Sequence, residues 1–212
     1  MTLYRPTHFR EDDPAALLAF VEKHAFGTLV SAGAKGLDVS HIPFLPERGA
    51  DGRLRLLGHV ARANAQWEAL PAAAHVVAIF EGPHAYVSPS WYGEHPSVPT
   101  WNYAVVHAHG SVRLMDEAGL RSLLERLSRH YEGDRPNAWR FSALPGDYVA
   151  KMLRAIVGFE LEVERLEGKF KLSQNRPAEI PRVIAALQAE GEAGLAELMR
   201  LHTPKPESKI TP

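Results

Sequence analysis

The sequence predicts an α+β protein built on an antiparallel β-barrel with peripheral helices. Short apolar runs at 26–32, 36–45 and 53–61 are joined by Gly-rich or Asp-Gly turns, a pattern typical of an antiparallel meander. Helical patterns occur at only a few points between the strands. Neither a G-x-G-x-x-G nor a P-loop motif is present, so a doubly wound nucleotide-binding sheet is not supported.

The predicted helices have clear start signals. Asp13 before Pro14 predicts a first helix that ends near His24, and NAQWEALP (64–71) predicts a short second one. Asp116 predicts the cap of a longer helix, in which residues 120, 123, 124, 127 and 131 form an apolar stripe. A helix that opens at Pro145 and a last helical stretch over 178–201 complete the set.

The remaining strands follow from apolar runs and alternation. Residues 74–82 and 85–91 indicate two strands around a Gly82-Pro83 turn, and 100–114 and 156–168 indicate two more. About seven strands therefore share one folded unit. We expect a barrel domain over 1–177, a helical segment packed on it over 178–201, and a disordered tail over 202–212.

The composition excludes several classes of protein. The chain of 212 residues has no Cys, 24 Lys and Arg against 25 Asp and Glu, and a pI near 6.8. The absence of Cys excludes disulfide frameworks, thiolate zinc sites and thiol nucleophiles, and makes a cytoplasmic location the expectation. There is no signal-peptide pattern and no apolar window long enough for a membrane span. The near-neutral charge gives no global reason to expect strong nucleic-acid binding.

Two neighbouring stretches, VSHIPF (39–44) and GHVARANAQW (58–67), hold polar groups suited to an anion. Arg62 follows a strand, and Asn64 is placed to cap the short helix that carries Gln66. A guanidinium beside free helix-N-terminal amides favours a phosphate. The alternatives are a surface arginine beside an ordinary N-cap, and an edge strand that Pro43 ends.

His107 and His109 lie two apart on a predicted strand and so project from one face, a spacing that some metal sites use. No third ligand is singled out by its spacing, and chance pairs are expected among eleven histidines. We therefore predict no metal site and assign the pair to the barrel lining or to an interface. No nucleophile elbow, H-E-x-x-H motif or Ser/His/Asp constellation supports a hydrolase.

Aromatic and basic residues gather in two further stretches. Residues 87–103 contain two Trp and two Tyr, and GKFKLSQNR (168–176) alternates lysines with Phe170 and Leu172 before it reaches Arg176. Rings and apolar walls hold flat ligands, while Arg, Ser and backbone N–H groups hold anions. These ingredients suit a flat aromatic ligand with a phosphate tail.

The chain resembles the PaiB-type family of FMN-binding negative transcriptional regulators in eight motifs that occur in family order: LYRPTHFRE, FGTLVS, SHIPFL, GHVARANAQW, GPHAYVSPSWY, VPTWNY, VHAHG and IVGFELEVERLEGKFKLSQNRP. The resemblance runs from about Tyr4 to Ile184. It implies an FMN-binding split β-barrel, related in architecture to pyridoxamine-phosphate oxidases and flavin reductases. It also implies a homodimer with FMN between the subunits.

The resemblance further implies which residues hold FMN. One subunit would supply candidates from the strand pair and short helix that hold phosphate in such barrels: Ser40, His41, Ile42, His59, Val60, Arg62, Asn64 and Gln66. The other subunit would supply Trp91, Thr100, Trp101, Asn102, Tyr103, Lys171, Gln174 and Arg176. Gln66 stands about where other barrels of this kind often carry a phosphate-binding lysine.

Three functions follow as alternatives: an FMN-binding negative regulator, a flavin-dependent oxidoreductase acting on an unassigned small molecule, and a heme- or metal-binding barrel. Regulation without catalysis is the first interpretation, and enzymatic activity is left open. The stretch PRVIAALQAEGEAGLAELMRLH (181–202) is too acidic through its middle for a DNA-recognition helix, so direct contact with DNA is left open as well.

Overall fold

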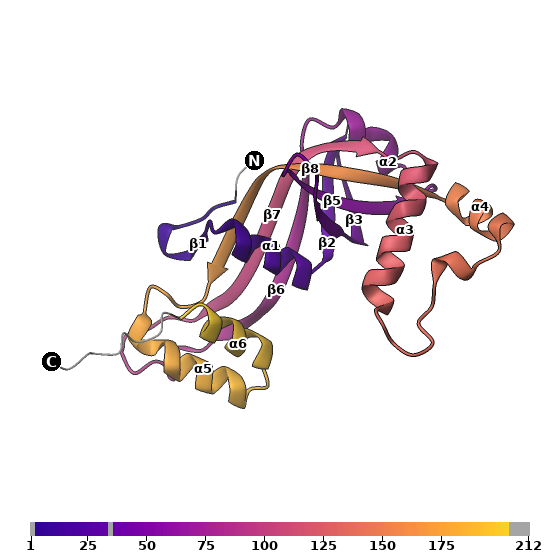
Figure 1. The fold of residues 1–212 in the computed structure, drawn as a ribbon. Coiled ribbons are helices and arrows are strands. Elements are labelled where there is room, and N and C mark those ends of the chain that lie inside the picture. Colours follow the sequence, from indigo (N-terminus) through magenta and orange to yellow (C-terminus); the bar gives the residue numbers. More distant parts are fainter. Residues whose placement is uncertain (1–2, 34–35, 204–212) are drawn as a thin grey trace. The chain divides into compact units, whose positions relative to one another are not determined.

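The computed structural model describes residues 3–33 and 36–203. Within these ranges the chain forms eight strands and six α-helices, with short 3-10 helices between them (Figure 1). The strands are β1 (Arg10–Glu11), β2 (Phe26–Gly33), β3 (Gly36–Pro43), β4 (Leu45–Arg48), β5 (Leu54–Ala61), β6 (Val76–Val87), β7 (Thr100–Leu114) and β8 (Ile156–Lys171). The helices are α1 (Pro14–Lys23), α2 (Gln66–Ala69), α3 (Glu117–Glu132), α4 (Gly146–Arg154), α5 (Ile180–Ala189) and α6 (Ala193–Leu201).

Most elements lie where the sequence predicts them, because their end signals are local. The Asp13 carboxylate accepts hydrogen bonds from the N–H groups of Ala15 and Ala16, at 3.3 and 3.2 Å. Asp116 accepts from the N–H of Gly119 at 2.8 Å and so caps α3. β7 spans the predicted 100–114, and α5 and α6 fall within the predicted helical stretch. Most of the predicted tail, from residue 204 onward, lies outside the described residues.

One prediction is wrong at Gly82-Pro83. The sequence predicts a turn between two strands there, whereas a single strand, β6, runs through both residues. The buried positions of β6 are even-numbered up to Phe80 and odd-numbered from Ala85 onward. The shift falls where β6 passes from the larger unit, which includes Phe80, to the smaller unit, which begins again at Glu81, so the two parts of the strand are buried in different units. As a result Glu81 and His84, three residues apart, are both exposed.

The chain forms two compact units. Of the described residues, the smaller unit comprises 3–12, 81–105 and 167–203. The larger unit comprises 13–33, 36–80 and 106–166. The long strands β6, β7 and β8 (Figure 1) each contribute residues to both. Neither unit is therefore one contiguous piece of chain.

The sheet has the strand order β3-β2-β6-β7-β8-β5-β4, and β1 pairs with β8. Within the larger unit, β2 pairs antiparallel with β3 and β6, and β5 pairs antiparallel with β4 and β8. β3 is at one end of this strand order and β5 is near the other end, yet the two strands are in contact. The Cδ1 atom of Ile42 lies 3.3 Å from the place that a Cβ would take on Gly58. This return of the first strand to a distant one is the closure that makes a barrel.

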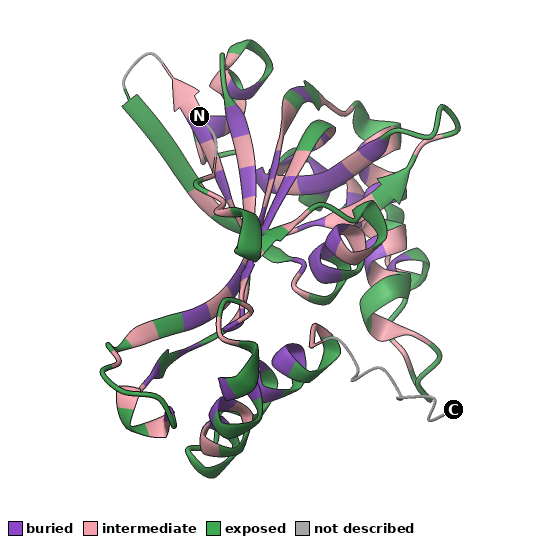
Figure 2. Cartoon of the chain, turned by 90° about the vertical axis from the view of Figure 1, so that its left-hand side faces the viewer, coloured by how far each residue is buried: buried purple, intermediate pink, exposed green. Residues whose placement is uncertain are grey.

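Three phenylalanines fill the core of the larger unit. Phe44, Phe80 and Phe159 are each at most 1% exposed, and the other two ring centroids lie 5.4 and 6.2 Å from that of Phe44, with the rings edge to face. Buried and exposed residues alternate along the strands around them (Figure 2). Each such ring stabilises the fold by roughly 1.5–3 kcal/mol through apolar burial.

α3 covers part of the larger unit's sheet. Its Leu123 and Leu127 pack on Leu57 of β5, and its Leu120 joins a second apolar cluster with residues of α4. The predicted stripe is therefore the buried face of this helix from Leu120 to Leu127, as amphipathic spacing requires, but it does not extend to Tyr131, which is 49% exposed.

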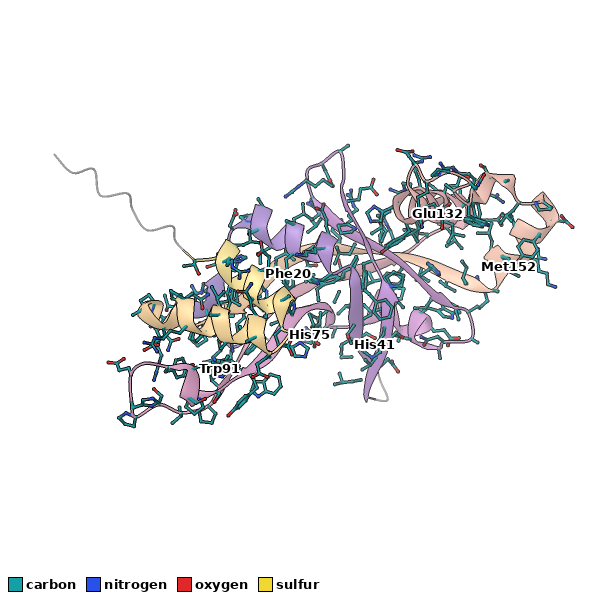
Figure 3. All side chains as sticks on the ribbon, turned by 90° about the horizontal axis from the view of Figure 1, so that it is seen from below. Phe20, His41, His75, Trp91, Glu132 and Met152 are labelled. Atoms are coloured by element: carbon teal, nitrogen blue, oxygen red, sulfur yellow. The ribbon has the colours of Figure 1, made fainter. Side chains whose placement is uncertain are left out.

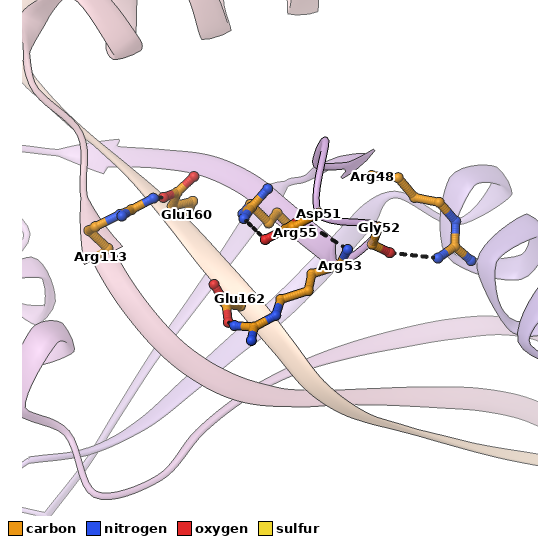
Figure 4. Close-up of polar contacts among 8 residues, drawn as sticks. All are labelled: Arg48, Asp51, Gly52, Arg53, Arg55, Arg113, Glu160 and Glu162. Carbon is orange, nitrogen blue, oxygen red and sulfur yellow. Dashed lines mark hydrogen bonds and ion pairs between the residues drawn. The ribbon is translucent and has the colours of Figure 1, made fainter.

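Arginine–carboxylate pairs lie on the turn between β4 and β5 and on the neighbouring strands (Figure 4). The pairs are Arg53–Glu162, Arg55–Asp51 and Arg113–Glu160, and Arg48 donates to the Gly52 carbonyl. A hydrogen bond from the backbone N–H of Arg53, together with the Arg55 guanidinium, lowers the pKa of the Asp51 carboxyl. Because water screens exposed pairs of this kind, they contribute little to stability.

In the smaller unit, α5 and α6 pack on each other. Val183, Leu187, Leu195 and Met199 are each at most 1% exposed. Among the described residues, no helix combines the length and the apolar character that crossing a membrane requires.

Candidate cofactor-binding site

Three of the predicted residues, Ser40, Asn64 and Gln66, form one hydrogen-bonded network in the larger unit. The Ser40 hydroxyl accepts from Asn64 Nδ2 at 2.8 Å and donates to Gln66 Oε1 at 2.5 Å. Asn64 Oδ1 accepts from the backbone N–H of Gln66, the first residue of α2, at 3.0 Å. The structure thus joins the strand motif VSHIPF to the short helix that follows β5.

Gln66 faces inward and is satisfied by protein groups. It is 3% exposed, and its amide nitrogen lies 3.0 Å from the Ser31 hydroxyl and 3.1 Å from the Asp38 carbonyl. A buried polar group must be hydrogen-bonded, and these acceptors suit a neutral amide. Gln66 therefore ties α2 to β2 and β3, and it acts by positioning its neighbours.

Arg62 is exposed but held in a fixed orientation. Its Nε donates to the Arg154 carbonyl at 2.7 Å and its Nη2 donates to the Ile156 carbonyl at 3.2 Å. The guanidinium lies 5.6 Å from the ring centroid of Trp67, whose indole N–H donates to the Arg62 carbonyl at 3.0 Å. A guanidinium carries five N–H donors, and two are used here. The remaining N–H groups can bind an anion, and the two hydrogen bonds to backbone carbonyls already orient them.

The other predicted residues of the larger unit take different positions. His41, labelled on β3 in Figure 3, is exposed and hydrogen-bonded to the Thr28 hydroxyl at 3.0 Å. Ile42 lies on the opposite face of the strand, as the sequence predicts, and Ile42 and Val60 are both buried. His59 is partly buried, and its Nδ1 is a buried atom without a hydrogen-bond partner.

Burial lowers the pKa of His59 below its ordinary value of 6.5. In the unfolded chain the ring takes up a proton near 6.5, whereas in the fold it resists the proton until a lower pH. Its contribution to stability is therefore fully present above about pH 6.5 and is lost as the pH falls from there through the folded pKa. We expect His59→Gln to flatten the decline of melting temperature between neutral and mildly acidic pH.

Thermal unfolding of the wild type and His59→Gln across that range measures the effect. Burial also lowers the pKa of His24. His24 is present in both proteins and supplies the pH dependence of melting temperature that remains in His59→Gln. Two curves of equal slope would show that protonation of His59 does not couple to folding.

In the smaller unit, β7 sends neighbouring side chains to opposite faces. Trp101 is 53% exposed and Tyr103 is partly buried on one face, while Asn102 is fully buried on the other. The Trp101 ring lies 6.3 Å from the rings of both His84 and Tyr86. A cavity of about 350 Å³ opens here, which we call the aromatic pocket; it is lined by Glu81, Gly82, His84, Trp101, Tyr103, Ala104 and Val105.

Two lysines of β8 place their ammonium groups among aromatic rings in the same unit. Lys169 Nζ lies 5.0 and 5.4 Å from the ring centroids of Tyr4 and Tyr103. Lys171 Nζ donates to the Thr100 hydroxyl and to the Trp101 carbonyl, both at 2.6 Å. Burial, together with the charge of Lys169, lowers the pKa of Lys171. Thr100, Trp101 and Lys171, all predicted, are thus brought together.

Asn102 and Gln174 hold the turn that follows β8. Asn102 Nδ2 donates to the Ser173 hydroxyl at 2.8 Å, and Ser173 has a φ of 69°, in the left-handed region. Gln174 accepts from the N–H of Leu172 at 2.7 Å and donates to the Phe170 carbonyl at 2.5 Å. Both side chains therefore stabilise local backbone.

Arg176 and Glu179 hold the loop between β6 and β7, which carries Trp91 (Figure 3). Arg176 lies 4.9 Å from the ring centroid of Tyr92 and donates to the Ser97 hydroxyl at 2.8 Å. The buried carboxylate of Glu179 accepts from the N–H groups of residues 93 and 94, at 2.9 and 3.2 Å. Arg176 is therefore engaged with the loop between β6 and β7.

Among residues 3–33 and 36–203, no three His, Cys, Asp or Glu side chains gather as metal ligands would. His107 and His109 project from the same strand with ring centroids 6.1 Å apart.

Two solved structures share the fold. The flavocytochrome Anf3 from Azotobacter vinelandii is 19% identical with a TM-score of 0.59, covering 79% of this chain and 72% of its own. The FAD and heme binding protein from Mycobacterium smegmatis is 16% identical with a TM-score of 0.57, covering 76% and 73%. At this identity the likeness shows the fold, and it confirms the predicted α+β split barrel.

Residues 3–165 match a family model described as "Putative FMN-binding domain". The chain is 32% identical, over 209 residues, to "Protease synthase and sporulation protein PAI 2" of Bacillus subtilis, covering 98% of this chain and all of that relative. The chain therefore belongs to this family of FMN-binding domains, and the resemblance to the PaiB-type family is confirmed.

FMN is the cofactor of this family, and the residues present fit its two ends. In the larger unit, the oriented guanidinium of Arg62 suits a phosphate. In the smaller unit, the exposed ring of Trp101 and the partly buried ring of Tyr103 suit a flat ring system. Glu81, which lines the aromatic pocket, was missed by sequence reasoning; the only local signal is a Glu and a His flanking Gly-Pro inside an apolar run.

Proposed function

We propose that the protein is an FMN-binding regulator of the PaiB type, and that FMN lies between the two subunits of a homodimer. The observation that carries the proposal is the fixed, exposed guanidinium of Arg62, which comes two residues before Asn64 of the Ser40–Asn64–Gln66 network. In this proposal Arg62 binds the phosphate, and the network positions the strand and helix around it. The partner subunit supplies the ring wall from its aromatic side chains.

The further candidate residues have secondary roles in this proposal. His41, Ile42, His59 and Val60 shape the phosphate side, and Trp91, Thr100, Trp101, Tyr103 and Lys171 form or support the ring wall. Asn102, Gln174 and Arg176 act indirectly, since their side chains hold the backbone on which that wall is built.

An exposed apolar surface supports the homodimer. Phe26, Leu37 and Val39 are 69, 66 and 55% exposed, and the cross-strand register of β2 and β3 brings them to one face of this hairpin. Leu37 and Val39 are neighbours on this face, whereas the hydrogen-bonded Thr28–His41 pair separates them from Phe26. Exposed apolar residues that gather on one face mark protein–protein contacts. Since one subunit provides the phosphate ligand and its partner the ring wall, a second copy is the partner that the cofactor requires.

Regulation is proposed to act through the state of the flavin. When bound, FMN supplies electron transfer in one- or two-electron steps. The Bacillus subtilis relative is named for protease synthesis and sporulation, which is the support for a regulatory role. Within the described residues, the two C-terminal helices carry no basic stripe of the kind that reads DNA.

Titration of the purified chain with FMN, combined with light scattering for its mass, tests the proposal. We expect one FMN per chain, a shifted flavin absorption spectrum and the mass of a dimer. A monomer that binds FMN would reject the interface position, and a protein without any FMN signal would reject the proposal as a whole. A promoter-fragment shift that survives moderate salt would replace indirect regulation with direct DNA binding.

A further inference from the structure

The carboxylate and the imidazole of the aromatic pocket can accept hydrogen bonds from a ligand, and the Trp101 indole N–H and the Tyr103 hydroxyl are the donors among its side chains. Glu81 contributes a carboxylate, which accepts hydrogen bonds, and it forms no ion pair with another residue that the structure describes. His84 Nδ1 lies 3.2 Å from the Gly82 carbonyl oxygen, and since a carbonyl only accepts, Nδ1 carries the proton. In the neutral imidazole, Nε2 is then an acceptor as well.

The apolar part of the lining is electron-rich. The indole of Trp101 and the phenol ring of Tyr103 contribute aromatic faces, which attract cations through their quadrupoles. The chain itself uses this chemistry next to the pocket, because the ammonium of Lys169 lies 5.4 Å from the ring centroid of Tyr103.

The neighbouring lysines do not fill the pocket with positive charge. Lys171 donates to the Thr100 hydroxyl and the Trp101 carbonyl, and neither Lys171 nor Lys169 is among the seven lining residues. All seven lining residues are described, and among them only Glu81 carries a formal charge. The ligand that complements this surface is therefore a cation that donates hydrogen bonds and has an apolar body.

The change in alternation along β6 creates this arrangement. In a regular strand, residues three apart face opposite sides, so Glu81 and His84 would not share a surface. The shift in alternation at Gly82-Pro83 exposes both, beside the two rings of β7.

We propose that the aromatic pocket binds a protonated primary amine with an apolar body, with Glu81 and His84 accepting from the ammonium group and Trp101 and Tyr103 packing on the body. The cavity of about 350 Å³ has room for an arylalkyl amine. The amine would pack on the rings of Trp101 and Tyr103 that the proposed function gives to the flavin, so the amine site goes beyond that function and is tested in protein without FMN.

Calorimetric titration of the full chain with phenethylamine and its isosteres tests the proposal. We expect binding of phenethylammonium, with 2-phenylethanol and 3-phenylpropionate at least tenfold weaker because they lack the charge or reverse it. The phenethyltrimethylammonium ion should also bind more weakly, since it cannot donate to Glu81 or His84. Equal binding of amine and alcohol would overturn the proposal.

Variants assign the effect to the pocket. Glu81→Gln should lower amine affinity roughly ten- to a hundredfold, the range for a hydrogen bond to a charged group. Glu94→Gln, another exposed acid of the smaller unit outside the pocket, should leave it unchanged. Unchanged affinity in Glu81→Gln, with its thermal unfolding equal to that of the wild type, would refute the site.

Titration of the wild-type protein with FMN, beside the amine titration, separates the two proposals. Amine binding without FMN binding would reject the proposed function alone, and FMN binding without amine binding would reject the amine site alone.

Discussion

Replacing Arg62 with alanine is expected to weaken FMN binding by about 1.5–3 kcal/mol, roughly ten- to a hundredfold. The guanidinium is held by two backbone carbonyls and the Trp67 ring, so its free N–H groups are oriented before the phosphate arrives. Pre-orientation of this kind reduces the entropy that binding must overcome. Quenching of flavin fluorescence during titration measures the change.

Two further variants make this test specific. Arg62→Lys keeps the charge but loses the planar fork, so its FMN affinity should fall between those of the wild type and the alanine variant. Arg121→Ala removes an exposed arginine of α3 that lies 3.8 Å from Glu117, and should leave FMN binding unchanged. If Arg62→Ala binds FMN as tightly as the wild type, the phosphate lies elsewhere.

Gly110→Ala is expected to be the most destabilising small substitution in β7. A Cβ at this position would lie 1.9 Å from the backbone oxygen of Glu162 and 2.9 Å from its carbonyl carbon. Backbone atoms cannot rotate away as a side chain does, so the two strands must separate. We expect a loss on the order of 3 kcal/mol or more, a large part of the 5–15 kcal/mol typical of a folded protein. Urea denaturation, or the yield of soluble protein, measures it.

Gly146→Ala is the matched control, because no atom lies within 4 Å of the Cβ that it would add. Gly146 is the first residue of α4, where alanine should stabilise the helix by up to about 1 kcal/mol. Equal stability of the two variants would contradict the close approach of β7 to β8 at Gly110.

Elements whose signals are local could be predicted from the sequence. The caps at Asp13 and Asp116 act within three residues, and the run from Thr100 to Leu114 carries its own strand pattern. The turn predicted at Gly82-Pro83 is wrong because β6 continues through both residues, and the longer strand overrides the local preference of that dipeptide.

The candidate site was only partly predictable. Asn64 and Gln66 could be found because they surround the start of a short helix, whereas Ser40 follows from the resemblance of its motif SHIPFL. Arg176 and Asn102 form hydrogen bonds with residues about 70 to 80 positions away in the sequence, and no spacing rule reveals such partners. For the same reason, sequence gave no sign that Gln66 donates to Ser31 and Asp38 rather than to a ligand.

The interleaving of the two units limits how such a protein can be divided or recombined. The match to the family model ends at residue 165, inside β8, whose last residues belong to the smaller unit. A fragment cut at that boundary would lose the lysine-bearing end of the strand, and neither unit could be exchanged between relatives by a single splice. Insertions at surface loops, and substitutions within each unit, are therefore the routes by which members of this family can diverge.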